Sequence, residues 1–425
     1  IIPFAGDADV SIIQSSIQWK DFLNRESSGI AFEALPFDHP LYIMYSSGTT
    51  GLPKSIVHSA GGTLIQHLKE LQLHTDLTED DNIFYFTTCG WMMWNWLVSS
   101  LSVGASIVLF DGSPFYPDGS ILLKMAKELG ITIFGTSAKY ISSLEAFEVN
   151  PNEISSFPKL RTILSTGSPL VEENFDYIYK HWKKDVQLAS ISGGTDIISC
   201  FVLGNPILPV RRGEIQCRGL GMKVEAYNQF GKSAINLKGE LVCSQAFPSM
   251  PIYFWNDVNG SKYHSAYFNT YSNIWHHGDY LEINDCGGVK IYGRSDTTLN
   301  PGGVRIGTAE IYQTVERFSE VEDSLVIGQP WKNDERIILF LKIKDQSTLS
   351  IELIRQIKKS IRESCSPRHV PAKLIAVKDI PYTINGKKVE MAVKQIIQNK
   401  NVINKDSLVN PNSLGFYKHI MELEK

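Results

Sequence analysis

Between residues 41 and about 195, short apolar runs rich in β-branched and aromatic residues alternate with longer segments of helical periodicity. Parallel strands need such helices, because a crossover must carry the chain back before the next strand can run in the same direction. The alternation therefore predicts βαβ units on a largely parallel sheet. The predicted strands lie at 41–45, 82–88, 105–110, 131–135, 160–166 and 186–191, and the clearest predicted helices at 91–101, 120–130 and 170–182.

The pattern changes twice further along the chain. From about 197 to 294 the helical period disappears, and short strands are separated by Gly, Pro and Asn. After 296, helical and strand patterns mix in a segment of the size of a small domain. The predicted fold is α/β: a large domain over 1–295 (its βαβ part to about 196, its β-rich subdomain at about 197–295) and a small C-terminal α+β domain over 296–425.

Charge and cysteine content exclude several classes of protein. The net charge of the 425 residues is −4, from 41 Lys and Arg against 45 Asp and Glu, which gives no basic surface for nucleic acid or an anionic membrane. The six cysteines are far apart and form no C-x-x-C pair. This spacing argues against a zinc site or a disulfide framework and predicts a reducing, cytoplasmic location.

Residues 83–110 contain no charged side chain and are long enough to span a bilayer. The flanking charges are Asp80, Asp81 and Asp111 rather than Lys or Arg, and polar residues interrupt the run. We therefore predict a buried strand, helix and strand here, and no membrane span. The chain opens Ile-Ile-Pro-Phe with no Met and no basic segment, so we expect no signal peptide and a large domain that lacks its N-terminal portion.

The string YSSGTTGLPKSIVHS at 45–59 predicts a strand that leads into a phosphate-binding loop. Backbone N–H groups and hydroxyls would bind the phosphates together with one cation, Lys54. A Walker A loop would need a glycine at position 53, where Pro53 has no N–H to donate, so a P-loop NTPase is excluded. For this string taken alone, a polar surface turn remains the alternative.

The same string, S-S-G-T-T-G-x-P-K, resembles the signature loop of the adenylate-forming superfamily of acyl-CoA synthetases, luciferases and peptide-synthetase adenylation domains. Further segments that resemble superfamily motifs follow in the expected order, at 167–169, 193–196, 277–280, 293–296, 302–310 and 385–387. Within the superfamily, the strings at 90–114 and 380–390 resemble most closely the members that activate acetoacetate.

The resemblance implies a two-step reaction on three small molecules: ATP, acetoacetate and coenzyme A. The carboxylate would attack the α-phosphate of ATP to give an acyl-adenylate and pyrophosphate, and the thiol of coenzyme A would then displace AMP. Two anions meet in the first step, so the site must neutralise charge and align the reactants rather than supply a nucleophile. No carrier domain is expected, because the tail after Asn399 is too short.

The resemblance also implies roles for individual residues. Lys387 would bridge the substrate carboxylate and the α-phosphate, and Thr195 would bind phosphate. Asp196 would hold the Mg²⁺ that accompanies ATP, although the superfamily usually has Glu here; the alternative is that Thr195 merely caps a helix. The further implied ATP and AMP contacts are Ser46, Ser47, Gly48, Thr49, Thr50, Gly51, Lys54, Gly167, Ser168, Pro169, Gly194, Asp279, Arg294 and Arg305.

In the second step, Gly302, Gly303 and Arg362 would contact coenzyme A. Asp296 would be the hinge about which the 296–425 domain turns between steps, and Lys388 would be a bystander beside Lys387. Lys387 follows Asn-Gly, the favoured dipeptide of a tight hairpin turn, although a pair of solvated lysines is the alternative.

Three histidines stand near these motifs. His276 and His277 are adjacent, so their side chains point apart, and with no partner four residues on we expect no metal site there. We expect His58 to be a structural neighbour of the phosphate loop rather than a base.

Gly193 bears on the identity of the acid. Acetate-specific relatives have a bulky Trp two residues before the position of Thr195, and Gly193 here implies a longer acyl pocket. A small residue cannot choose acetoacetate over butyrate or a branched acid, so another short-, medium- or branched-chain acid remains an alternative. A module that loads a carrier protein and a non-catalytic nucleotide-binding protein are further alternatives. The short tail opposes the former, and the presence of Lys387, Asp279 and Thr195 opposes the latter.

Overall fold

The computed structural model forms two units, Ile1–Phe37 and Asp38–Lys425. It describes residues 9, 13–23, 29, 31–46, 54–301, 304, 306–332, 334–345, 347–383, 386–402, 405 and 408–424. The first unit contains a four-residue helix, α1 (Trp19–Phe22), with no buried side chain. The rings of Trp19 and Phe22 stack with their centroids 6.0 Å apart. All the elements described below belong to the second unit.

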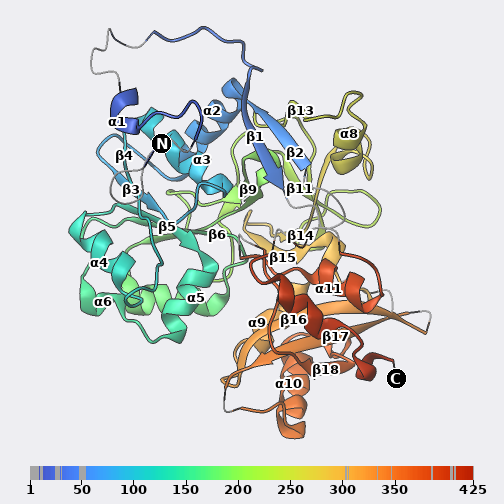
Figure 1. Cartoon of the computed structure of the whole chain (residues 1–425). Helices are drawn as coiled ribbons and strands as arrows, with labels where there is room; N and C mark the ends of the chain where they lie inside the picture. Colours follow the sequence, from blue (N-terminus) through green and yellow to red (C-terminus); the bar gives the residue numbers. More distant parts are fainter. Residues whose placement is uncertain are drawn as a thin grey trace. The chain divides into compact units, whose positions relative to one another are not determined.

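Five parallel strands in the order β4-β3-β5-β6-β7 form a sheet that helices accompany (Figure 1). The strands are β3 (Asn82–Tyr85), β4 (Ser106–Val108), β5 (Ile133–Ser137), β6 (Thr162–Thr166) and β7 (Gln187–Ser190); the helices are α3 (Met92–Ser99), α4 (Ile121–Glu128), α5 (Ala138–Ala146), α6 (Pro151–Ile154) and α7 (Glu172–Tyr177). Strands β5 and β6 are buried over almost their whole length, as expected where helices cover both faces. The predicted parallel βαβ arrangement is confirmed for the predicted strands between 82 and 191. The predicted strand at 41–45 is instead antiparallel to residues 54–59 in a separate sheet.

The segment that contains the predicted phosphate loop begins with two antiparallel strands, β1 (Pro40–Ser46) and β2 (Lys54–Ser59). Strand β13 (Tyr253–Phe254) pairs with the other edge of β2. Helix α2 (Ala60–Leu68) follows, capped by the Ser59 hydroxyl, which accepts a hydrogen bond from the backbone N–H of Gly62. It continues into a π-helical segment, η2 (Lys69–His74).

Two antiparallel sheets make up the predicted β-rich region. Their strands are β8 (Ser192–Gly194), β9 (Ser199–Leu203) and β10 (Cys217–Arg218) in one sheet, and β11 (Val224–Tyr227), β12 (Lys238–Cys243), β14 (Trp275–Ile283) and β15 (Val289–Arg294) in the other. The sequence did not predict helix α8 (Ser261–Tyr267), which is too short to show a helical period. The Asp257 carboxylate stabilises its start by accepting hydrogen bonds from the backbone N–H groups of Lys262 and Tyr263.

After residue 296 the chain forms its own sheet and cores (Figure 1). The elements are α9 (Thr308–Val315), β16 (Val321–Trp331), β17 (Asp334–Ile343), α10 (Ile351–Ser364), β18 (Lys373–Ala376) and α11 (Glu390–Ile397). Strand β16 is antiparallel to β17, and β18 is parallel to it. 3-10 helices follow at Pro411–Tyr417 and Met421–Leu423.

Ion pairs connect this part to residues before 296. Lys238 Nζ lies 2.6 Å from Glu310 Oε1, and Arg317 Nη2 lies 2.6 Å from Glu173 Oε1. The domain boundary at 295 and 296 stays a prediction.

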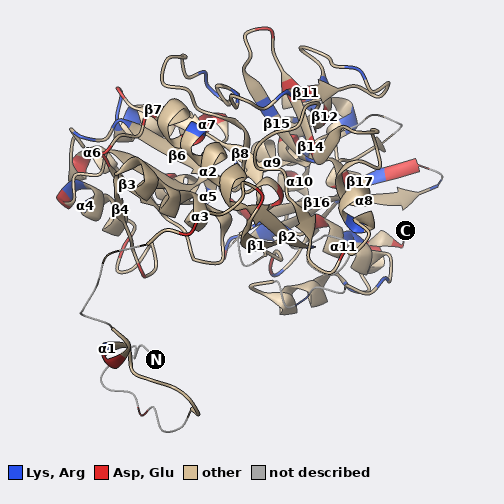
Figure 2. Cartoon of the chain, turned by 90° about the horizontal axis from the view of Figure 1, so that it is seen from above, with Lys and Arg blue, Asp and Glu red and all other residues tan. Residues whose placement is uncertain are grey.

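Acidic and basic side chains are interspersed along the elements (Figure 2). Among the helices of the described ranges, none is long and apolar enough to cross a membrane.

Candidate active site

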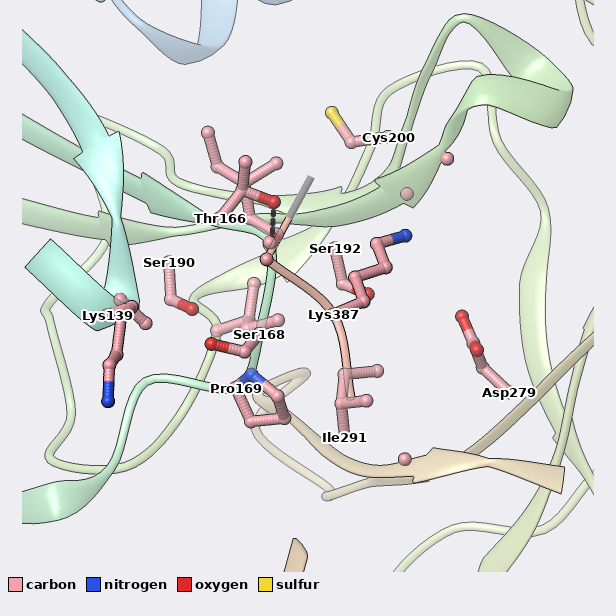
Figure 3. A pocket seen from close by; sticks show the side chains of 18 of the residues that line it. Lys139, Thr166, Ser168, Pro169, Ser190, Ser192, Cys200, Asp279, Ile291 and Lys387 are labelled. Carbon is pink, nitrogen blue, oxygen red and sulfur yellow. Dashed lines mark hydrogen bonds between the residues drawn. The ribbon is translucent and has the colours of Figure 1, made fainter. Parts of the chain in front are cut away.

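A cavity of about 390 Å³ lies at the carboxyl end of β6, where β8, β14, β15 and the turn before α11 meet. It brings together residues that the sequence analysis singled out: Gly167, Ser168, Pro169, Gly193, Gly194, Thr195, Asp279, Arg294 and Lys387. In Figure 3 the Lys387 side chain extends into this cavity, in view between Ser192 and Asp279. Carboxyl ends of parallel strands are where α/β proteins commonly bind ligands.

The parallel sheet sets one wall of the cavity. Strand β6 ends at Thr166, whose hydroxyl donates a 2.8 Å hydrogen bond to the carbonyl of Ile191 beyond β7 (dashed in Figure 3). The chain then turns at Gly167, whose φ of +95° is a left-handed conformation that glycine adopts without strain. Ser168 and Pro169 follow from this turn and line the cavity.

Asp196 and Lys54 form an ion pair beside the cavity. Lys54 Nζ lies 2.8 Å from Asp196 Oδ1, and the Tyr267 hydroxyl donates to the same oxygen at 2.5 Å. Burial opposes the charge on Asp196, but the nearby ammonium of Lys54 holds the pKa of this carboxyl well below its usual range. The carboxylate is therefore ionised at neutral pH.

His58 holds the Thr195 segment against β2. Its Nε2 lies 3.1 Å from the carbonyl of Thr195, which places the ring proton on Nε2. Burial lowers the pKa of His58 to about 4, so the ring is neutral. Thr195 begins a three-residue 3-10 helix whose N-cap is Gly194, so the helix-cap alternative for Thr195 does not hold.

Asp279 and Arg294 are paired across β14 and β15, with Arg294 Nη1 3.3 Å from Asp279 Oδ1. The same guanidinium nitrogen donates to the carbonyl of His277 at 3.1 Å. Between these residues, Gly278 has φ +84°, and a Cβ there would lie 2.8 Å from Arg294 Nη2. Glycine at 278 thus allows the guanidinium to approach the backbone.

His277 is a second buried neutral histidine next to this pair. Its ring packs edge-on against Phe201 with centroids 4.7 Å apart, and burial lowers its pKa to about 4.

Lys387 follows Gly386, whose φ is +72°. Among the described residues its ammonium forms no ion pair. Burial by the cavity walls lowers the pKa of Lys387, an effect that the negative charge of Asp279 opposes.

Gly193 lines the cavity, but the direction of its missing side chain is blocked. A Cβ at this position would lie 2.2 Å from the carbonyl oxygen of Ser199 and 2.3 Å from Cα of Cys200. Glycine at 193 therefore allows β8 to approach β9 closely, a reason for this residue that the sequence did not reveal.

Several predicted site residues do not line the cavity. Ser46 and Lys54 are paired at the ends of β1 and β2. Arg362 is exposed in the last turn of α10, and Asp296 lies in a short 3-10 helix, Ser295–Thr297. The other predicted contacts lie outside the described residues; they are Ser47, Gly48, Thr49, Thr50, Gly51, Gly302, Gly303 and Arg305.

Sequence reasoning missed a buried carboxylate in the cavity wall. Glu70, in the π-helical segment, accepts hydrogen bonds at 3.0 Å from Trp96 Nε1 and from Gln66 Nε2, and another from the Ser199 hydroxyl. Despite its burial, the pKa of Glu70 is lowered by neighbouring positive charge, of which Lys69 is the largest source. The one sequence signal was a charged residue in the middle of an otherwise buried helix face.

A family model described as AMP-binding enzyme matches residues 8–246. The chain belongs to the AMP-binding enzyme family. The predicted resemblance to adenylate-forming enzymes is thereby confirmed.

Relatives within the family are similar over the whole chain. An acetoacetyl-coenzyme A synthetase of Rhizobium meliloti is 54% identical over 100% of this chain and 66% of its own length. An acetoacetyl-CoA synthetase of Danio rerio is 53% identical over 100% of this chain and 64% of its own length. This chain thus spans slightly less than two thirds of these curated relatives.

Solved structures support the same fold. The acetoacetyl-CoA synthetase from Streptomyces lividans superposes with a TM-score of 0.93 at 41% identity, covering 100% of this chain and 65% of that one. The anthranilate CoA ligase AuaEII, in complex with anthranoyl-AMP, shares the fold with a TM-score of 0.72 at 22% identity, covering 86% of this chain and 69% of that one. The predicted α/β fold class is confirmed.

Proposed function

We propose that this protein ligates acetoacetate to coenzyme A in an ATP-dependent reaction that passes through an acyl-adenylate and releases AMP and pyrophosphate. The observation that carries the proposal is the shared cavity of Lys387, Thr195, Asp279 and Arg294 in a member of the AMP-binding enzyme family. Acetoacetate is proposed from the names of the relatives that are 54% and 53% identical.

The charges around the cavity suit the first half-reaction. The substrate carboxylate and the α-phosphate repel one another, so a cation between them lowers the barrier. Lys387 is proposed for this role because its ammonium enters the cavity and pairs with no described carboxylate. Thr195 is proposed to donate to a phosphate oxygen.

The remaining proposed contacts bind the ribose, the base and the phosphates of the nucleotide. Asp279 would accept hydrogen bonds from the ribose hydroxyls, with Arg294 holding its carboxylate in place at 3.3 Å. Gly167, Ser168, Pro169 and Gly194 would line the base and phosphates. Lys54 would exchange its Asp196 partner for a phosphate oxygen.

The protein supplies only part of the ligand shell that a magnesium ion needs. Mg²⁺ at nucleotide sites takes one or two carboxylates and completes its shell with phosphates and water. Asp196 is ionised and offers one hard oxygen ligand of this kind. When bound, Mg²⁺ would neutralise phosphate charge.

We further propose that residues 296–425 turn as one body about 294–296 between the half-reactions, with coenzyme A contacted by Gly302, Gly303 and Arg362. Support comes from the two hydrophobic clusters that this part forms among its own residues, from 299 to 423. A cytoplasmic location is part of the proposal, because all six cysteines are free thiols, which suits a reducing compartment.

The test is the variant Lys387→Ala, assayed separately in each half-reaction in the native gene product. Adenylate formation, followed by pyrophosphate release, should fall by on the order of 10²–10³, the usual cost of one positioned donor. Thioester formation from supplied acyl-adenylate should be largely spared. Lys342→Ala, which removes the ammonium of a lysine that does not line the cavity, is the control.

Equal losses in both half-reactions would remove Lys387 from this role. A panel of acids tests the substrate: a clear preference for butyrate or a branched acid would favour a different acyl-CoA synthetase.

A further inference from the structure

The adjacent residues Lys387 and Lys388 face different surroundings. Tyr382 and Lys388 are antiparallel partners across a turn, and the backbone N–H of Thr383 donates to the carbonyl of Lys387 at 2.8 Å. In such extended backbone, successive side chains point to opposite sides. Both lysines line the cavity: Lys387 points towards the side that carries Asp279, while Lys388 points towards the side formed by Glu316 and Asp323.

The Lys388 ammonium has an acceptor for each of its three N–H groups. Its Nζ lies 2.5 Å from Glu316 Oε1, 3.0 Å from Asp323 Oδ1 and 2.6 Å from the carbonyl of Ser324. It also lies 4.1 Å from the centre of the Tyr312 ring. The side chain is 17% exposed, against 12% for Asp323. Removing one partner of a buried pair leaves an uncompensated charge, so this contact is costly to break.

Lys388 is charged in this environment. Burial opposes the charge, but the carboxylates of Glu316 and Asp323 raise the pKa of Lys388. The neighbouring Lys387, whose pKa is lowered, has no comparable anchor among the described residues.

The same cluster also holds the other arm of the turn. The Tyr382 hydroxyl donates to Asp323 Oδ2 at 2.6 Å, so Asp323 contacts both arms. The Tyr312 hydroxyl donates to Glu390 Oε1 at 2.9 Å, where α11 begins. Helix α9 and strand β16 are thus tied to both ends of the segment that carries Lys387.

We propose that Lys388 is a positioning residue, which fixes the turn on Asp323 and Glu316 so that Lys387 is held in the cavity. This inference rests on the proposed role of Lys387. Since Lys387 acts only when the carboxylate meets the phosphate, Lys388 supports adenylate formation and not thioester formation.

The test uses variants that separate charge from folding. Lys388→Met combined with Asp323→Asn removes both charges and leaves no unpaired carboxylate of that pair. Asp323→Asn alone keeps Lys388 paired with Glu316, and Lys388→Arg keeps the cation. Lys342→Met is the control, because Lys342 also pairs with two carboxylates, Glu322 at 2.7 Å and Asp379 at 3.3 Å, away from the turn.

In the double variant, kcat for adenylate formation should fall about 10²-fold, the cost of misplacing a reacting group by about 1 Å. KM for ATP and thioester formation from supplied acyl-adenylate should stay within about threefold of wild type. Asp323→Asn should also slow adenylate formation and spare thioester formation, but by a smaller factor. Lys388→Arg should retain most of the wild-type rate of adenylate formation. Lys342→Met should match wild type.

Equal loss in both half-reactions, adenylation no slower than in Lys342→Met, or Lys388→Arg no better than the double variant would each overturn the positioning role. The variant Lys387→Ala, assayed in parallel, distinguishes a failure of the Lys388 proposal from a failure of the proposed function. If Lys387→Ala leaves adenylation intact, the proposed function fails; if it abolishes adenylation and the double variant does not, only the role of Lys388 fails.

Discussion

Acidification should destabilise this protein through its buried histidines, among them His58 beside Thr195 and His277 beside Asp279. His58 is 1% exposed and His277 is 8% exposed, and burial lowers both pKa values to about 4 from the ordinary value of 6.5. The unfolded chain takes up protons near pH 6.5, whereas the folded protein resists them until about pH 4. The stabilisation is therefore complete above pH 6.5 and is lost as the pH falls towards 4.

The size of the effect follows from the same two values. Between pH 7 and pH 5, each histidine should cost about 2 kcal/mol of unfolding free energy, so together they cost about 4 kcal/mol. This window lies above the ordinary pKa values of carboxyl groups, which limits their contribution.

The assay is urea unfolding followed by tryptophan fluorescence at both pH values. His58→Gln and His277→Gln should each reduce the difference in unfolding free energy between pH 7 and pH 5 by about 2 kcal/mol, whatever they do to stability at pH 7. The remaining difference includes the buried His67 and His74, whose pKa values burial also lowers. The exposed His39, changed to Gln, is the control and should leave the difference unchanged. A difference that is the same in wild type and both variants would refute the assignment.

Three further perturbations test the site. Gly193→Ala should lower stability by about 1–3 kcal/mol, because its Cβ would overlap β9; an unchanged melting temperature would contradict this close approach. Gly193→Trp should lose at least as much stability, because its Cβ would meet the same backbone. Asp196→Asn should raise the Mg²⁺ concentration for half-maximal adenylation at least about tenfold, and an unchanged titration would exclude Asp196 as ligand. Asp296→Pro fixes φ near −65° and should cripple one half-reaction while sparing the other; two intact half-reactions would argue against the rotation.

Most of the fold was predicted from the periodicity of apolar residues along the chain. The parallel sheet was predictable because apolar runs of strand length recur between helical segments. Helix α8 was not, since its seven residues depend on the side chain of Asp257 rather than on an apolar face.

The residues of the site also divide into those that the sequence predicted and those that it did not. Lys387, Asp279 and Thr195 were found because short strings resemble known motifs, and the fold gathers them at one cavity. Glu70 was not found, because its partner Ser199 is 129 positions away in the sequence. Lys388 was interpreted as a bystander because no local pattern reveals Glu316 or Asp323, which only folding brings to it.

Because Lys387 and Lys388 point to opposite sides, the number of residues in the turn before them decides which lysine faces the reactants. Deleting one codon between Thr383 and Lys387 would shift the extended residues before α11 by one position, so that Lys388 would take the place of Lys387 beside Asp279. A lysine would then still face the reactants, but the acidic cluster of Glu316 and Asp323 would meet Val389 instead. Such a frame-preserving deletion would keep a lysine beside the reactants and remove the ion pairs that hold it there.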